Sequence, residues 1–157
     1  MTLAETLHQK LNDWRPAGEG RHHAVVALDE QGWSASLTAD HVDTVGGKFW
    51  EVTLQRLGEL PPADLKAWAG AIADRVTGLM EPLALYEIDA SEGVALLRSE
   101  SPTQRGGAKL YYEIRLGESH SATVRRYQYA PDAGKRTQIA FALTHESLAK
   151  LAGDIAA

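Results

Sequence analysis

The sequence predicts an α+β domain with one antiparallel β-sheet of about six to eight strands and amphipathic helices packed mainly on one face. The chain has 157 residues, which suits a single domain with its own hydrophobic core. Several short segments alternate apolar and polar residues between turn-forming residues, as half-buried strands do. Three other segments place apolar residues at every third or fourth position, as amphipathic helices do.

The first 60 residues predict one helix followed by three strands. Thr2 and Glu5 have the spacing of a capping box, in which each side chain binds the other residue's backbone N–H. The helix that follows carries its apolar stripe on Leu3, Leu7, Leu11 and Trp14 and ends before Pro16. We expect the strands at residues 23–28, 33–40 and 48–57, with turns at 29–32 and at Gly46-Gly47.

The second part predicts a helix, five strands and a final helix. Pro61 and Pro62 open the helix, because proline in the first turn loses no hydrogen bond. Its apolar stripe comprises Leu65, Trp68, Ala69, Ile72, Val76 and Leu79. We expect the strands at 83–88, 94–98, 108–116, 122–129 and 136–143, with a bulge between Val124 and Tyr127, which are out of phase. Thr144 caps a short final helix with its apolar stripe on Leu148, Leu151, Ala152 and Ile155.

The turn positions indicate an internal repeat within this single domain of residues 1–157. Asp29, Gly46 and Gly58 recur as Asp89, Gly106 and Gly117, at offsets of 60, 60 and 59 residues. The two α-βββ units would be residues 1–60 and 61–157, the second carrying an extra hairpin near 120–143. A meander of short strands also places glycines at turns without duplication, so both interpretations stay open.

This order of helix, three strands, helix, further strands and helix resembles the type III secretion chaperone-like fold. The resemblance covers about residues 1–118 and lies in the order of elements, without a shared motif. It implies a small, acidic, usually dimeric cytoplasmic chaperone that holds a partly unfolded client without catalysis. The extra hairpin and the short final helix depart from that pattern.

The composition excludes several kinds of chemistry. The absence of cysteine rules out disulfides, thiol nucleophiles, iron–sulfur clusters and cysteine-bound zinc. We expect a cytoplasmic protein, since the sequence has neither a secretory leader pattern nor an apolar run of about 18 residues. The 16 basic and 21 acidic side chains give a formal charge of −5, which disfavours a dedicated nucleic-acid binder.

No pattern assigns a catalytic residue, a cofactor or a metal. The sequence has no P-loop, zincin or kinase signature, so we lean towards a protein without enzymatic activity. The six histidines lack the i, i+4 spacing of helical metal ligands, and the adjacent His22 and His23 would point to opposite faces of a strand.

One segment concentrates positive charge. Residues 98–136 carry eight basic and four acidic side chains, a balance of +4 that leaves −9 for the remainder. Lys109, Tyr111 and Arg115 should share one strand face, and the following strand could add further cations and tyrosines beside them. The candidates for binding a partner or an anion are Lys109, Tyr111, Arg115, Arg125, Arg126, Tyr127 and Tyr129. The same pattern also suits an ordinary solvated sheet face.

Three hypotheses for function follow. The first is a non-enzymatic protein-binding or chaperone-like module that acts through the open sheet face or an edge strand. We expect such a module to form a homodimer and not to contact membranes. The second is a small-molecule site or enzyme with a pocket between sheet and helices. The candidates for that pocket are Trp33, Trp50, Tyr112, His41 and His120. The third is weak binding of nucleic acid or an anionic ligand through the basic strands at 109–136.

Overall fold

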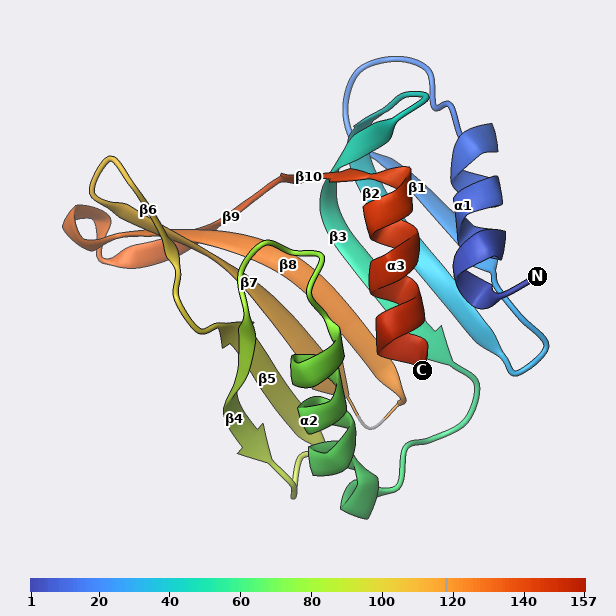
Figure 1. The fold of residues 1–157 in the computed structure, drawn as a ribbon. Coiled ribbons are helices and arrows are strands. Elements are labelled where there is room, and N and C mark those ends of the chain that lie inside the picture. The colour runs from blue at the N-terminus through green and yellow to red at the C-terminus, as the bar shows by residue number, and fades with distance from the viewer. Residues whose placement is uncertain (118) are drawn as a thin grey trace.

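The computed structural model describes residues 1–117 and 119–157, and over these residues it shows an α+β fold with ten strands in one antiparallel sheet. Three helices cover one face of that sheet, which confirms the predicted fold class (Figure 1). The helices are α1 (Leu3–Asp13), α2 (Leu65–Arg75) and α3 (His145–Ala156). The strands are β1 (His22–Ala27), β2 (Trp33–Val42), β3 (Gly46–Arg56), β4 (Leu83–Asp89), β5 (Val94–Ser99), β6 (Thr103–Arg105), β7 (Ala108–Gly117), β8 (Ser121–Ala130), β9 (Lys135–Ile139) and β10 (Phe141–Thr144).

The sheet consists of two three-stranded meanders joined by a later strand. The order across the sheet is β1-β2-β3-β8-β7-β5-β4, with β10 paired to β3, β6 to β7 and β9 to β8. The hairpin expected near residues 120–143 is therefore not peripheral, because its first strand, β8, lies between the two meanders. This arrangement is compatible with duplicated units, and the duplication itself stays a prediction.

The structure corrects several predicted boundaries. The second helix ends at Arg75, and Val76 adopts an extended backbone. Val76 and Leu79 are buried all the same, from a loop that continues over the sheet. The strand expected at 136–143 is divided at Ala140 into β9 and β10, which pair with different neighbours. The short strand β6 was not anticipated.

Two local predictions were wrong for reasons of packing. No bulge occurs between Val124 and Tyr127, since β8 keeps one continuous register with β7. Val124 is buried on the helix side, and Tyr127 is buried on the opposite face, where Arg136 stacks on its ring. Gly46-Gly47 is not a turn but the start of β3, where this strand pairs with β10. A Cβ on Gly46 would lie 2.4 Å from the carbonyl oxygen of Leu143, so this close approach requires glycine.

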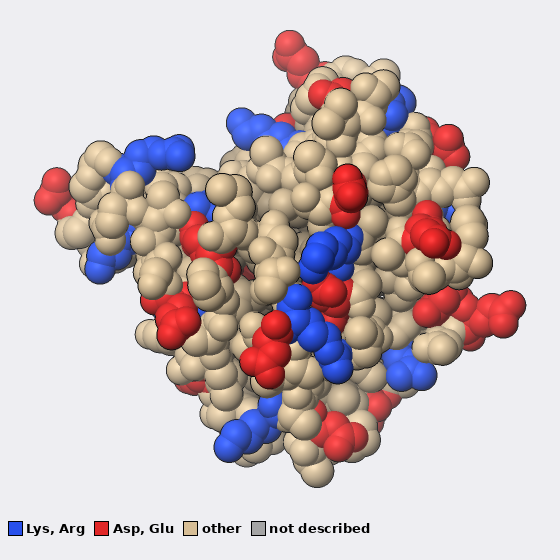
Figure 2. Space-filling view, in the orientation of Figure 1, with Lys and Arg blue, Asp and Glu red and all other residues tan. Residues whose placement is uncertain are grey.

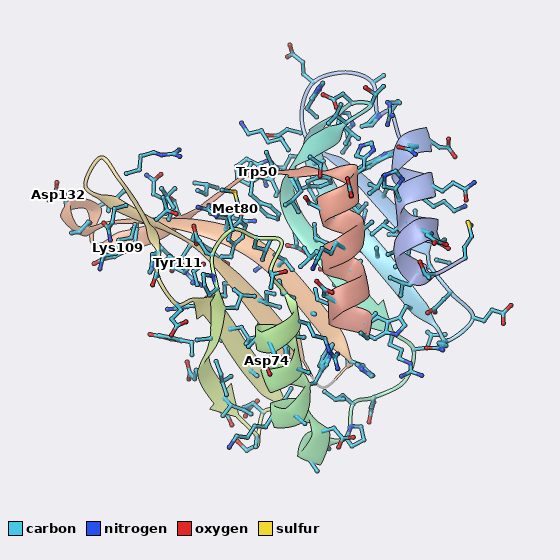
Figure 3. The ribbon with its side chains drawn as sticks, viewed as in Figure 1. Trp50, Asp74, Met80, Lys109, Tyr111 and Asp132 are labelled. Carbon is cyan, nitrogen blue, oxygen red and sulfur yellow. The ribbon has the colours of Figure 1, made fainter. Side chains whose placement is uncertain are left out.

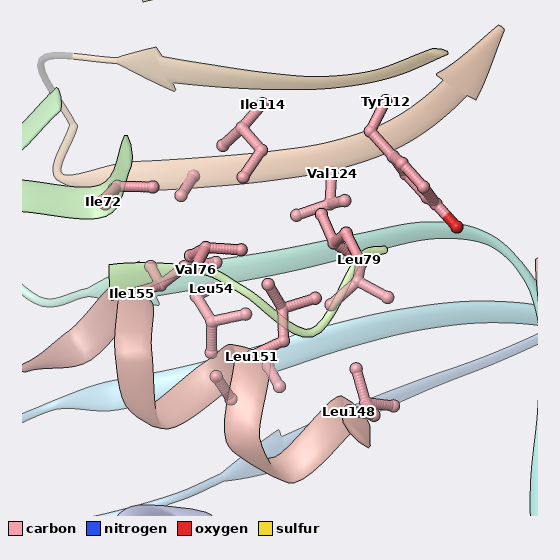
Figure 4. Packing of buried hydrophobic residues seen from close by; sticks show 14 of the residues in the cluster. Leu54, Ile72, Val76, Leu79, Tyr112, Ile114, Val124, Leu148, Leu151 and Ile155 are labelled. Atoms are coloured by element: carbon pink, nitrogen blue, oxygen red, sulfur yellow. The ribbon is translucent and has the colours of Figure 1, made fainter. Parts of the chain in front are cut away.

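The hydrophobic core lies between the three helices and the sheet. Alternate residues of the central strands, among them Ile114 and Val124, point towards the helices and are fully buried. Leu148, Leu151 and Ile155 of α3 face them across the core (Figure 4). Each such side chain contributes about 1.5–3 kcal/mol when it leaves water. The same alternation turns the intervening residues of each strand towards the opposite, helix-free face.

A buried histidine joins the first and last helices. His145, at the start of α3, is 2% exposed, and its Nδ1 lies 3.1 Å from Oδ1 of Asn12 on α1. The ring of His8 packs edge-on against it. Burial lowers the pKa of His145, with smaller contributions from Arg15 and His8 that exceed the opposing effect of Asp43. The neutral form is therefore the one that fits between the helices.

This contact predicts a loss of stability in mild acid. Because the pKa of His145 is lower in the folded chain than in the unfolded chain, the unfolded chain takes up the proton first as the pH falls below about 6.5. The free energy of unfolding, measured by urea titration, should decrease from about pH 7.5 to about pH 5.5. Burial also lowers the pKa of His120, so protonation of this histidine should decrease stability over the same pH range. His145→Gln should reduce the slope, and an unchanged slope would contradict this role.

Candidate functional site

The helix-free face of the sheet carries a band of polar and aromatic side chains over β5, β7, β8 and β9, which we term the open face. The pairing of β7 with β8 sets Lys109 opposite Tyr129 and Tyr111 opposite Tyr127. The strands therefore bring together the cations and tyrosines that alternation in the sequence had placed on one face. Figure 3 shows Lys109 and Tyr111 along β7, where the sheet extends beyond the helices.

Glu113 organises the centre of this face. Its Oε2 accepts hydrogen bonds from Nε of Arg98 at 2.9 Å and from Nη1 of Arg136 at 2.8 Å. Glu113 is 6% exposed, so its charge requires these partners. Burial alone would lower the pKa of Arg136, but hydrogen bonds to Glu113 and Tyr111 outweigh it and raise that pKa above its usual value. Both guanidinium groups are consequently fixed in place.

The fixed guanidinium groups stack on tyrosine rings. The Arg98 guanidinium carbon lies 3.9 Å from the centre of the Tyr86 ring and 5.4 Å from that of Tyr111. The Arg136 guanidinium carbon lies 3.8 Å from the centre of the Tyr127 ring, which in turn packs against Tyr111. Cation–π contacts of this kind add about 0.5–2 kcal/mol each. The result is a row of flat groups across neighbouring strands.

A hollow of about 510 Å³ opens on this row. Tyrosines, two cations and Glu100 form most of its wall, with Ala84, Leu85 and Pro102 as apolar neighbours. A register shift in β4, between Leu85 and Glu87, accompanies the position of Tyr86 over Arg98. The polar and aromatic residues of the wall are Tyr86, Arg98, Ser99, Glu100, Lys109, Tyr111 and Tyr129.

The other predicted partner-binding residues lie outside the hollow. Arg125 pairs with Glu51 of β3 at 2.8 Å, further along the open face. Arg115 lies in a separate depression near Glu87, Asp89 and Glu92. Arg126 faces the helix side, where its Nη2 donates to Glu81 at 3.0 Å.

The five residues predicted for a pocket between sheet and helices do not share one cavity. Trp33 and His120 pack together with Trp68 on the helix side. Trp50 donates from Nε1 to Asp40 at 2.7 Å and lies under the guanidinium of Arg21. The ring of His41 is largely in solvent beside Asp43.

Tyr112, the fifth of these residues, lines a different hollow of about 460 Å³ together with Met80, Glu81 and Arg126. Figure 3 shows Met80 beside the part of the sheet that projects beyond the helices. Burial raises the pKa of the Tyr112 hydroxyl, although the nearby Arg126 opposes this effect. The side chain of Tyr112 is therefore a neutral group in an ion-paired, largely apolar setting.

Ion pairs offset part of the charge imbalance in the sequence. Glu51 and Glu81, from the acidic remainder, bind Arg125 and Arg126 of the basic segment. Glu113 binds the two arginines nearest the hollow. Charges of both signs are also interspersed on the helix side (Figure 2). Across residues 1–117 and 119–157, no carboxylate oxygen lies within 4.0 Å of the Lys109 ammonium.

Two further features of the described residues, 1–117 and 119–157, concern metal ions and membranes. No group of three or more His, Cys, Asp or Glu side chains is arranged to hold a metal ion. No helix in this part of the chain is both long and apolar enough to cross a membrane.

Sequence reasoning missed Tyr86, Glu113 and Arg136 as members of the site. Strand alternation places Glu113 on the face of Lys109 and Tyr111, and this was the available signal. No sequence signal indicated Tyr86, because its position depends on the irregular register of β4.

Comparisons with protein-family models, curated proteins and solved structures find no match for this chain. The function is therefore inferred from the residues of the open face alone.

The contacts of Glu113 predict that a single substitution at this residue lowers the free energy of unfolding substantially. Glu113→Gln keeps the shape of the side chain but leaves two partly buried guanidinium groups without a counter-charge. We expect a loss of about 2 kcal/mol in the free energy of unfolding, between the values for exposed and buried ion pairs. Asp154→Asn, which breaks the exposed pair with Lys150 on α3, is the matched control and should change stability by under about 0.5 kcal/mol. Equal effects would contradict the central role of Glu113.

Proposed function

We propose that this protein is a non-enzymatic, chaperone-like protein-binding module that receives an extended polypeptide segment in the hollow of the open face. The observation that carries the proposal is the hollow itself, which presents three tyrosine rings beside a lysine on a surface that no helix covers. Tyrosine supplies large, rigid and amphipathic contact area, which is why it is enriched where proteins bind one another. A cytoplasmic location belongs to the same proposal.

The charges favour a protein segment over nucleic acid. Arg98 and Arg136 share the single carboxylate of Glu113, which leaves these three side chains with one net positive charge, and Glu100 adds a negative charge to the wall of the hollow. A nucleic-acid strand would meet few cations free to bind phosphates. A segment that combines apolar side chains with an acidic residue placed near Lys109 complements the hollow in both shape and charge.

A selection from random peptides tests the proposal. Peptides displayed on phage and selected on the immobilised protein should be enriched in apolar residues with a neighbouring Asp or Glu. Lys109→Glu should weaken binding of the selected peptides about tenfold, as measured by fluorescence anisotropy, because the acidic residue loses its partner. Lys66→Glu, which reverses an exposed charge on α2, is the control and should bind as the unaltered protein does.

Two outcomes would refute this function. One is a selection that yields no peptide of consistent pattern. The other is a set of peptides whose binding responds equally to Lys109→Glu and Lys66→Glu, since binding would then take place elsewhere.

We further propose that the protein forms a homodimer through the edge strand β4. This strand pairs only with β5 in the described part of the chain, so its outer backbone groups are free. Leu85 and Ile88 are each 37% exposed along it. A second copy would cover this apolar edge.

Light scattering coupled to size-exclusion chromatography tests the dimer. The unaltered chain should elute at twice its 17.1 kDa mass. Ile88→Lys should elute as a monomer, because it places a charge in the interface. Val25→Lys, on the opposite edge strand β1, should stay dimeric, and circular dichroism should show that both variants are folded. A monomeric unaltered chain, or equal behaviour of the two variants, would refute this interface.

A further inference from the structure

We propose that the segment bound in the hollow is proline-rich and adopts the polyproline II conformation. This inference rests on the proposed function, since it names the class of polypeptide that the same hollow receives. It is carried by the spacing of the aromatic rings and by the absence of free backbone groups on the floor of the hollow.

The floor of the hollow offers a ligand no backbone partners. The floor of the hollow is the face of the inner strands β5, β7 and β8, whose backbone groups are directed along the sheet into the ladders with their neighbours, and the edge strand β4 forms one rim. A β-strand laid across this face would therefore bury N–H groups that have no acceptor, at about 1–3 kcal/mol each. Proline has no N–H group, so a proline-rich segment avoids that cost.

The spacing of the rings matches the repeat of a polyproline II helix. Tyr86 lies on β4 and Tyr111 on β7, with β5 between them. Because the guanidinium carbon of Arg98 is 3.9 Å from the centre of the Tyr86 ring and 5.4 Å from that of Tyr111, the two ring centres are at most about 9.3 Å apart. A polyproline II helix advances about 9.3 Å in each turn of three residues. Prolines one turn apart can therefore pack on these two rings.

The groups between and beside the rings suit the same ligand. The guanidinium of Arg98 fills the space between Tyr86 and Tyr111 as a flat surface, held there by Glu113. The carbonyl groups of a polyproline II helix make no internal hydrogen bonds, so they can accept from tyrosine hydroxyls and from Lys109. Tyr129, opposite Lys109 on β8, extends the row. Grooves lined by aromatic rings bind proline-rich segments in this way.

Titration of the 15N-labelled protein with synthetic decaproline tests the inference. We expect backbone amide shifts in the nuclear magnetic resonance spectrum to change for residues of β4, β5, β7 and β8 around the hollow, and to saturate. A decapeptide of alternating glycine and serine should cause no such changes, because it is flexible and has no ring to stack.

Substitution of the exposed rings supplies the matched comparison. Tyr86 is 61% exposed and Tyr129 is 37% exposed, so both can be shortened with little effect on the core. Tyr86→Ala combined with Tyr129→Ala should raise the Kd for decaproline about tenfold. Val25→Ala removes an exposed apolar side chain on the distant strand β1 and should leave that Kd unchanged.

The outcomes separate this inference from the function on which it rests. If selected peptides bind at the hollow but lack proline and decaproline does not bind, the ligand class is wrong and the proposed function stands. If neither the selected peptides nor decaproline binds at the hollow, the proposed function and the inferred ligand class both fail. If single-stranded oligothymidylate shifts the same amides and decaproline does not, the open face binds nucleic acid and both proposals are overturned. Equal affinity of the double variant and Val25→Ala for decaproline also overturns the inference.

Discussion

The position of β8 between β3 and β7 is the constraint on which the rest of the structure depends. This strand pairs with β7 at one side and with β3 and then β9 at the other. Val124 of this strand is buried towards the helices and Tyr127 towards the open face. The core and the candidate site are thus opposite sides of one strand, and a shift of its register by one residue would exchange them.

Ion pairs within the molecule offset part of the charge pattern of the sequence. The basic segment begins at β5 and ends at β9, and two of its arginines pair with Glu51 and Glu81, which lie earlier in the chain. Such pairs add little stability where they are exposed and more where they are partly buried. Their larger consequence is to orient side chains, since Glu113 holds two arginines flat against tyrosines. Lys109 is left as a cation near the hollow.

Local patterns predicted the elements well, because alternation and helical periodicity report on which face of each element is buried. The capping box at Thr2 and the cap at Thr144 were confirmed for the same reason, since they depend on residues three positions apart. The order of the strands was not predictable, because β8 could have paired in several ways. Within the site, alternation located Lys109 and Tyr111, whereas Tyr86 depends on an irregular pairing between two strands.

The structure also bears on why the sheet can leave one face without helices. An exposed sheet face must shield its apolar area from water and from other chains. Here the stacked arginines and tyrosines perform that role, since each guanidinium covers a ring while keeping its own edge polar. A surface built in this way is stable when empty. It still offers flat apolar area to a ligand that stacks, and little to a ligand that must form backbone hydrogen bonds. The property that protects the open face therefore also selects what can bind to it.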